Sequence, residues 1–401
     1  MPPLMRIPYT APLPPALTIP ASARTVSGAV AALAAFLTAP PAPHLLRQGG
    51  GAGSAAGLEG RRGRGGPASG GAVLLSGAGV SVASGLADYR GQSGTYTLNK
   101  SYKPIYYSEF VNEDYARRRY WARSFLGWST LDRARPNRAH WAVKELGEMG
   151  LVGEVITQNV DSFHPTVHPS LPTTELHGAL RSVVCLSCGT HYPRSSFQRI
   201  LARLNPTWAA FLADLERSGA LSSEDPAHRR ARGLRTNPDG DVDVPGVQYD
   251  RFAYPACPRC AGRKRGAAGA EAAGLWADEL SAGGEEPYPD HHHPHRPSAT
   301  LLDGPHAAVL KPAVVMFGEA IAPPVRAAAD AALDRAGRLL VVGSSLATYS
   351  AWRLARRAKE RGIPVGVVNL GGVRGEEAFF ADVEDGADGI VERDYASQNS
   401  C

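Results

Sequence analysis

The sequence predicts an α/β fold built on a doubly wound parallel sheet, with a smaller module inserted into it. Short apolar runs, typical of strands buried on both faces, occur at residues 73–75, 339–342 and 364–368. Segments with the apolar spacing of helices, such as 325–336 and 351–361, alternate with these runs. Strands that alternate with helices pair in parallel through right-handed crossovers. Two closely spaced cysteine pairs interrupt this alternation and indicate the inserted module.

Length and composition limit the classes of protein. A chain of 401 residues can hold one large or two medium domains. The apolar fraction of 43% and charged fraction of 20% suit a globular chain. A net charge of +5 gives no strong case for nucleic acid, so we expect no direct nucleic-acid partner. The apolar run at residues 29–37 is too short to span a membrane, and we expect no membrane partner.

A glycine turn follows the first buried run. Gly77 and Gly79 allow a sharp turn and a close approach of a ligand, and we expect the first turn of a helix to follow. The amides at a helix start favour phosphate, as in dinucleotide sites at the first turn of a doubly wound sheet. An ordinary strand–turn–helix corner is the alternative, because the third glycine is delayed to Gly85. A dehydrogenase has no need for the polar cluster of Asp88, Tyr89 and Arg90 that comes next.

Polar residues follow three further apolar runs, at 158–161, 343–345 and 369–371. Each could be a capped helix start, which is the commoner case. Because ligands of open α/β sheets bind at the carboxyl ends of strands, we expect one extended polar crevice. His177 comes shortly after the first of these segments. A lone histidine is more often structural, but an imidazole at this crevice can act as a general base.

The cysteines indicate a metal. Four of the five form two Cys-x-x-Cys pairs, Cys185 with Cys188 and Cys257 with Cys260. Four thiolates suit tetrahedral Zn²⁺ and leave no open position, so we expect a structural zinc ion; a redox pair is the alternative.

The remaining segments complete a provisional domain division. We expect a leader and first helix at 1–48, a Gly/Arg-rich linker at 49–71 and a Rossmann-like domain at 72–184 and 308–395. The zinc-binding module should occupy 185–261 and a low-complexity insertion 262–307. Further helices are expected at 27–37, 139–149 and 197–215 and within 102–128, with a polar loop at 222–245. The basic linker is a solvated loop or a nucleic-acid patch, and the histidine tract at 291–295 is disordered surface or an adventitious metal site.

The N-terminal composition suits a mitochondrial transit peptide, which would place the protein in the matrix. Arg6, Arg24 and Arg47 are present, and no acidic residue occurs before Glu59. A proline-rich disordered leader is the alternative. Residues 26–37 could also be the first helix of the folded domain, which would limit a removable peptide to the first two dozen residues.

These motifs, in this order, resemble those of the sirtuins. The matching segments are Gly77-Ala78-Gly79-Val80-Ser81, 84–91, Gln158-Asn159-Val160-Asp161 within 157–164, Leu176-His177-Gly178, the four cysteines, 311–312, 317–319, Gly343-Ser344-Ser345-Leu346 and 368–369. The resemblance covers about residues 73–391. Finer matches at 119–128, 137–141, 205–208 and 238–242 resemble the class II, mitochondrial sirtuin-4 type.

The resemblance implies an NAD⁺-dependent protein-lysine deacylase that also holds Zn²⁺ and acts on an acyl-lysine protein or peptide. Acetyl is the default acyl group, and longer acyls are open. The amide oxygen of the substrate would attack the ribose carbon that bears nicotinamide, and His177 would then act as base on a ribose hydroxyl. Protein mono-ADP-ribosylation and a non-catalytic NAD-sensing scaffold are the alternatives.

The same resemblance implies roles for further residues. Asn159 would be catalytic together with His177, shaping the nicotinamide pocket with Asp161. The implied cofactor-binding residues are Gly77, Ala78, Gly79, Val80, Asp88, Tyr89, Arg90, Gln158, Asn159, Val160, Asp161, Gly343, Ser344, Ser345, Asn369, Leu370 and Gly371.

The chain departs from the family pattern in three places. Ala87 stands where the family usually has proline, so we expect that loop to be more mobile. Phe163 replaces a usual leucine, and the insertion at 262–307 lies beside the zinc module, where it could block part of the peptide groove.

Overall fold

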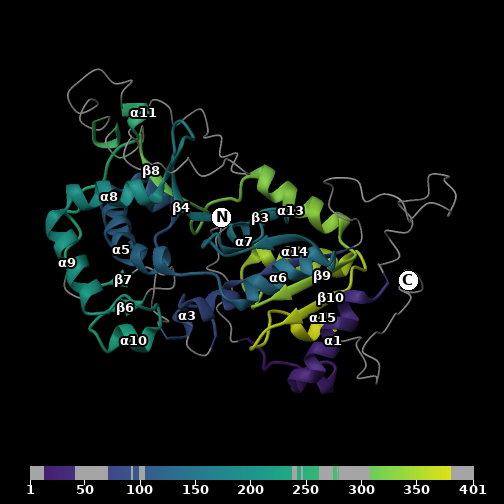
Figure 1. Ribbon diagram of the computed structural model, residues 1–401. Helices are drawn as coiled ribbons and strands as arrows, with labels where there is room; N and C mark the ends of the chain where they lie inside the picture. Colours follow the sequence, from purple (N-terminus) through teal and green to yellow (C-terminus); the bar gives the residue numbers. More distant parts are fainter. Residues whose placement is uncertain are drawn as a thin grey trace, which may run out of the picture.

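Five parallel strands form the central sheet of the computed structural model, in the order β10-β9-β1-β2-β3 (Figure 1). Their bounds are Ala72–Ser76 (β1), Val152–Thr157 (β2), Thr173–Glu175 (β3), Arg338–Val342 (β9) and Val365–Val368 (β10). In the register of the sheet, Leu75 of β1 lies beside Ile156 of β2 and Val341 of β9. The strand order reverses at β1, which is where open α/β sheets place their ligand crevice. The predicted parallel sheet is therefore confirmed.

The structure describes residues 13–40, 71–91, 94–98, 104–236, 242–244, 247–261, 274–277, 279 and 308–380. The predicted linker up to residue 70, the histidine tract at 291–295 and Cys401 lie outside these ranges. In the described part of the chain, no helix is long and apolar enough to cross a membrane.

Helices cover both faces of the sheet, because successive strand residues point to opposite sides. Helices α1 (Val26–Thr38) and α6 (Arg138–Glu148) pack on one face, and α13 (Pro323–Arg335) and α14 (Tyr349–Glu360) pack on the other. The first face buries Leu37, Leu74, Val143, Val155 and Leu340. The second face buries Leu75, Ile156, Leu333, Val341 and Leu354. The sheet is thus doubly wound.

A second, smaller sheet contains one of the four paired cysteines, Cys185. Strands β4 (Gly178–Cys185), β5 (His191–Pro193) and β8 (Leu310–Val314) pair antiparallel in the order β5-β4-β8. Helices α5 (Asp114–Arg133) and α8 (Arg194–Leu204) pack with it around a large aromatic core. In Figure 1 these elements lie to the left of the parallel sheet. The domain boundaries drawn from the sequence stay a prediction.

The glycine turn leads into a helix as expected, a seven-residue 3₁₀ helix, η2 (Ala78–Ser84). Two other sequence-based expectations about local structure are wrong. The helix expected at 197–215 is two helices, α8 and α9 (Pro206–Arg217), because Pro206 has no backbone N–H and begins a new helix. The polar loop at 222–245 contains α10 (Pro226–Arg230) and a short hairpin of β6 (Arg235–Thr236) and β7 (Val242–Asp243).

The insertion at 262–307 is not surface throughout. Trp276 is 1% exposed, and its ring centre lies 4.7 Å from that of Tyr192. Its indole N–H donates to the carbonyl of Ala256 at 3.2 Å, and Glu279 forms an ion pair with Arg199 of α8. Part of the insertion therefore belongs to the core of the smaller unit.

The described N-terminal segment packs against the folded domain. Arg338 donates hydrogen bonds to carbonyl oxygens at the end of α1, including that of Pro40 at 3.1 Å. The backbone N–H of Leu17 donates to Glu376 at 2.6 Å. Residues 26–37 are thus the first helix of the folded domain, as one reading of the sequence has it. The shorter elements are η1 (Ala21–Arg24), α3 (Thr95–Leu98), α4 (Tyr107–Asn112), α7 (Phe163–Val167), α11 (Pro258–Ala261) and α15 (Glu376–Phe380).

Candidate functional site

The carboxyl ends of the five parallel strands form one edge of the sheet. Since the order is β10-β9-β1-β2-β3, the segments that follow them lie side by side along this edge. They are, in spatial order, 369–371, 343–345, 77–79, 158–161 and the segment around His177. The structure therefore brings the polar strand ends to one edge of the sheet, where the sequence predicts the crevice.

Glycines allow the loops at the centre of this edge to touch. A Cβ atom on Gly77 would lie 2.7 Å from the carbonyl oxygen of Gly343, and one on Gly79 would lie 2.9 Å from it. Gly343 itself has φ of 60°, a left-handed conformation that glycine adopts without strain. The backbone N–H of Gly79 donates to the carbonyl of Gly343 at 2.9 Å. These glycines are thus required by contact between the ends of β1 and β9.

Gln158 joins the ends of two strands across β1. Its amide nitrogen donates to the hydroxyl of Ser344 at 2.7 Å, and its amide oxygen accepts from the hydroxyl of Thr348 at 3.0 Å. Both partners lie in the segment between β9 and α14. Gln158 therefore fixes the spacing between two walls of the crevice.

The protonation of His177 is set by two hydrogen bonds. Its Nδ1 lies 3.0 Å from the carbonyl oxygen of Gln158, which can only accept, so Nδ1 carries the proton. Its Nε2 lies 2.7 Å from the hydroxyl of Ser350, in the first turn of α14. Burial lowers the pKa of His177 from 6.5, so the ring is neutral at pH 7. Nε2 is then an acceptor, as a general base requires.

A buried polar network lies beside the glycine turn. Asn159 donates from Nδ2 to the carbonyl of Gly77 at 3.1 Å and to the hydroxyl of Ser81 at 3.2 Å. Ser81 donates to Asp161 at 2.7 Å, and the backbone N–H of Phe163 donates to the other carboxylate oxygen at 2.9 Å. The buried Oδ1 of Asn159 has no hydrogen-bond partner among the described residues. It is free to accept a hydrogen bond from a ligand.

A cavity opens on this network. Its charged lining residues, among those described, are Asp161 and Glu224, and both are acidic. The full lining is Ala78, Ser81, Leu86, Ala87, Tyr89, Ser124, Gly127, Trp128, Leu131, Asn159, Val160, Asp161, Leu180 and Glu224. An aromatic and apolar wall beside the carboxylate of Asp161 suits a flat ring that carries positive charge.

The other predicted cofactor residues lie around this cavity without all facing it. Tyr89 lines it, whereas the guanidinium of Arg90 lies 5.0 Å from the ring centre of Tyr96. Asp88 accepts a hydrogen bond from Gly91 at 3.2 Å, and burial raises the pKa of its carboxyl.

The remaining cofactor residues sit at or beyond the central strands. Val80 is buried in η2, and the carbonyl of Ser345 accepts from Arg374 at 2.9 Å. At the far end of the edge, Asn369 donates to Gly371 at 2.8 Å, and Leu370 is fully exposed. The roles assigned to these residues stay predictions.

Three residues of the site were missed by sequence reasoning. Ser350 contacts His177, Ser81 joins Asn159 to Asp161, and Glu224 reaches the cavity from the loop between α9 and α10. Ser81 could have been found, because it stands inside the first glycine motif. Ser350 and Glu224 lie in segments without any catalytic pattern, so only packing brings them to the site.

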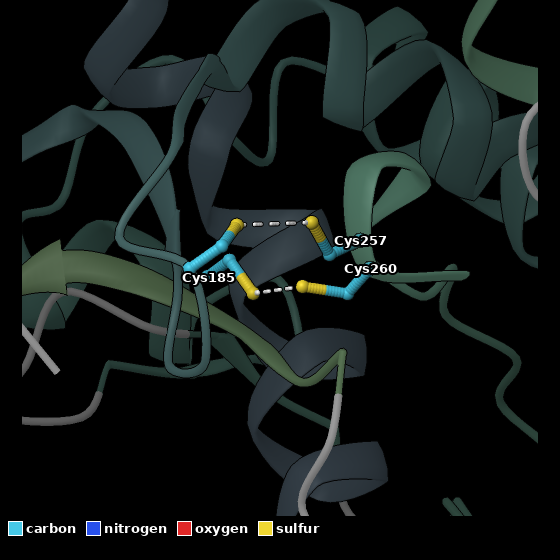
Figure 2. Close-up of side chains that lie close together, drawn as sticks. Cys185, Cys257 and Cys260 are labelled. Carbon is cyan, nitrogen blue, oxygen red and sulfur yellow. Dashed lines mark hydrogen bonds between the residues drawn. The ribbon is translucent and has the colours of Figure 1, made fainter. Parts of the chain in front are cut away.

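The four cysteine sulfurs point toward one another (Figure 2). The sulfurs of Cys185 and Cys260 are 3.7 Å apart, as are those of Cys188 and Cys257. All four lie within 4.8 Å of one another. A zinc ion with Zn–S bonds of about 2.3 Å requires neighbouring sulfurs about 3.8 Å apart, whereas a disulfide requires about 2 Å. The residues therefore fit a tetrahedral zinc ion.

The acidity of these thiols also fits a metal centre. Hydrogen bonding with Cys185 lowers the pKa of the Cys257 thiol, which favours its thiolate form. The shared hydrogen bond and burial raise the pKa of Cys185, because two adjacent buried thiolates repel. A divalent cation would offset the repulsion between the thiolates and allow all four sulfurs to ionise.

Comparison with known proteins identifies the family of this chain. The Sir2 family model matches residues 77–350. The NAD-dependent protein deacylase SIR4 of Batrachochytrium dendrobatidis is 36% identical over 327 residues, covering 80% of this chain and 87% of that protein. The NAD-dependent protein deacetylase 2 of Bradyrhizobium diazoefficiens is 34% identical over 313 residues, covering 78% and 88%. A solved Sir2–p53 peptide–NAD⁺ complex covers 77% of this chain and 84% of its own, with 21% identity and a TM-score of 0.43. Since the family model spans more than half of the sequence, the chain belongs to the Sir2 family.

Proposed function

We propose that the protein is an NAD⁺-dependent protein-lysine deacylase that releases nicotinamide and transfers the acyl group to ADP-ribose. The observation that carries the proposal is the state of His177, a neutral imidazole whose Nε2 is an acceptor at the ligand edge of the sheet. Relatives named as NAD-dependent deacylases and deacetylases support it.

The residues of the crevice fit NAD⁺. The free Oδ1 of Asn159 can accept a hydrogen bond from a carboxamide N–H, and the carboxylate of Asp161 favours a cationic ring in the cavity. The segments at 343–345 and 369–371 would hold the adenosine half, and Arg90 would lie near the phosphates. When bound, NAD⁺ supplies a ribose carbon that accepts the acyl oxygen as nicotinamide leaves.

His177 would remove the proton from a ribose hydroxyl. Its Nε2 is held by Ser350 at 2.7 Å, so that hydroxyl marks the position from which a donor O–H reaches the base. The carbonyl of Gln158 accepts from Nδ1–H and stabilises the charged ring that forms after proton transfer. The rate should therefore rise with pH and level off below the ordinary histidine pKa of 6.5, because burial lowers the pKa of His177.

An acyl-lysine peptide would bind along the segment that follows β8. This segment is held in place by Lys311, whose ammonium lies 3.2 Å from Glu319 and donates to the carbonyl of Val314 at 2.7 Å. The carbonyl of Phe317 accepts from Tyr107 at 2.8 Å. The chain turns at Gly318, where φ is 86° and the backbone N–H of Glu319 donates to the carbonyl of Met316 at 2.9 Å. The segment after this turn and the loop after Leu346 would bracket an added peptide strand.

The finer assignments are also proposals. The motifs at 119–128 and 205–208 support the class II, sirtuin-4-like type, and the arginines of the first 58 residues support import into mitochondria. N-terminal sequencing of protein recovered from the organelle tests the location. A start at Met1 in organelle-free cytosol would exclude it.

A panel of acyl-lysine peptides, assayed for nicotinamide release, tests the activity. His177→Ala should lower turnover by about 10²–10⁴-fold and leave the fold intact. His191→Ala on β5, whose ring contacts Ser182 at 3.2 Å, is the matched control and should retain turnover. NAD⁺ binding without nicotinamide release from any peptide would instead identify a non-catalytic sensor, and full turnover by His177→Ala would exclude the assigned base.

A further inference from the structure

Glu224 brings a carboxylate from the smaller unit into the wall of the cavity. It lies in the loop between α9 and α10, yet it is only 7% exposed and lines the cavity with Asn159 and Asp161. A buried carboxylate must be held by hydrogen bonds, because removing it from water is unfavourable. The hydrogen bonds of Glu224 therefore identify the segment that it stabilises.

Glu224 clamps the loop that follows η2 at two points. Its backbone N–H donates to the carbonyl of Gly85 at 3.0 Å. Its side-chain Oε2 accepts from the backbone N–H of Ala87 at 2.8 Å. The clamped residues begin loop 85–91, which carries Leu86, Ala87 and Tyr89 into the cavity. Contacts at two atoms fix both the position and the direction of the chain there.

The clamp is itself anchored to helix α5 and to α10. The hydroxyl of Thr130 in α5 donates to the carbonyl of Leu221 at 2.8 Å. Arg229 of α10 is fully buried and donates to the carbonyl of Ser223 at 3.1 Å. Asp225 caps α10 by accepting from the backbone N–H of His228 at 2.7 Å. Residues on both sides of Glu224 are therefore held, and the carboxylate is preorganised.

The clamp depends on the residue at position 87. A proline there would have no N–H to donate, and its ring would restrict the loop by itself. Ala87 leaves the backbone freer and offers the donor that Glu224 uses. The hydrogen bond from Ala87 to Glu224 thus supplies the restraint that a proline would supply within the loop. It therefore opposes the greater mobility expected from Ala87.

We propose that Glu224 is a positioning residue that holds loop 85–91 in the geometry needed for NAD⁺ binding, by hydrogen bonding and not by its charge. The proposal rests on the proposed function only for the identity of the ligand. The loop restraint exists in the chain without any ligand.

Calorimetric NAD⁺ binding and hydrogen–deuterium exchange of the cofactor-free protein test this role. Glu224→Ala should weaken NAD⁺ binding about tenfold, because the hydrogen bond that holds the loop is lost. It should also speed exchange in the peptide that contains Ala87, while peptides of β4 and β8 stay unchanged. Glu224→Gln keeps an acceptor oxygen and should bind NAD⁺ within about twofold of the wild type, with near-native exchange. Equal loss in the Gln and Ala variants would overturn the proposal in favour of direct charge recognition.

A second background separates the loop restraint from any other effect of Glu224→Ala. Ala87→Pro removes the donor and restrains the loop internally, so adding Glu224→Ala to it should change NAD⁺ affinity less than twofold. A tenfold further loss in that background, or unchanged exchange and affinity in Glu224→Ala alone, would overturn the clamp. Nicotinamide release is a separate measurement: a chain that binds NAD⁺ with an intact clamp but never turns over would refute the enzyme and not this inference.

Discussion

Replacing Glu175 by glutamine should stabilise the protein at pH 8 and change its stability little near pH 4. Glu175 ends β3, two residues before His177, and its Oε1 accepts from the hydroxyl of Ser162 at 2.8 Å. Burial, opposed in part by that hydrogen bond and reinforced by the charge of Asp161, raises the pKa of the Glu175 carboxyl from 4.5 to about 7. Glutamine keeps the acceptor oxygen and resembles the protonated acid.

The direction in which the free energy of unfolding changes with pH follows from proton linkage. Between pH 4.5 and 7 the unfolded chain has released the Glu175 proton while the folded chain still holds it, so the wild type loses stability as pH rises. A difference of about 2.5 pH units between the two pKa values corresponds to about 3 kcal/mol. Because the side chain of Glu175 is only partly buried, solvent screening reduces this value, and we expect about 1–2 kcal/mol of it to appear.

Urea denaturation of both proteins at pH 5 and pH 8 measures the effect. The advantage of Glu175→Gln in free energy of unfolding should grow by about 1–2 kcal/mol between these values. Glu148→Gln is the control, since that side chain is 64% exposed at the end of α6, and it should show no comparable growth. If the difference in free energy of unfolding between Glu175→Gln and the wild type were equal at both pH values, burial would not be what raises the pKa of Glu175.

Two further predictions concern the smaller sheet. Cys260→Ser should lose most of the bound zinc and lower the free energy of unfolding by several kcal/mol, as should chelation of the wild type; one retained zinc per chain would exclude the four-thiolate centre. Lys311→Met should cost about 3–5 kcal/mol, because it leaves the carboxylate of Glu319 buried without its cation, and adding Glu319→Gln should recover at least half of that in a double-mutant cycle. Strictly additive losses would show that the pair is not coupled.

Local patterns predicted most of the regular structure. The apolar runs at 73–75 and 339–342 became β1 and β9, since a strand buried on both faces needs a continuous apolar run and little else. The break at Pro206 was also visible locally and was overlooked. The hairpin of β6 and β7 could not be predicted, because two-residue strands are too short to show a periodicity.

The sequence by itself determined which chemical groups the protein has: four thiolates in two pairs, an imidazole after a polar strand end, and a glycine turn. Tertiary structure alone decided how they act. The Nδ1 proton of His177 is placed by the carbonyl of Gln158, 19 residues away, and its Nε2 contacts the hydroxyl of Ser350, 173 residues away. Glu224 restrains a loop through Ala87, 137 residues away. Contacts over such separations depend on how whole elements pack, and no local pattern of residues encodes them.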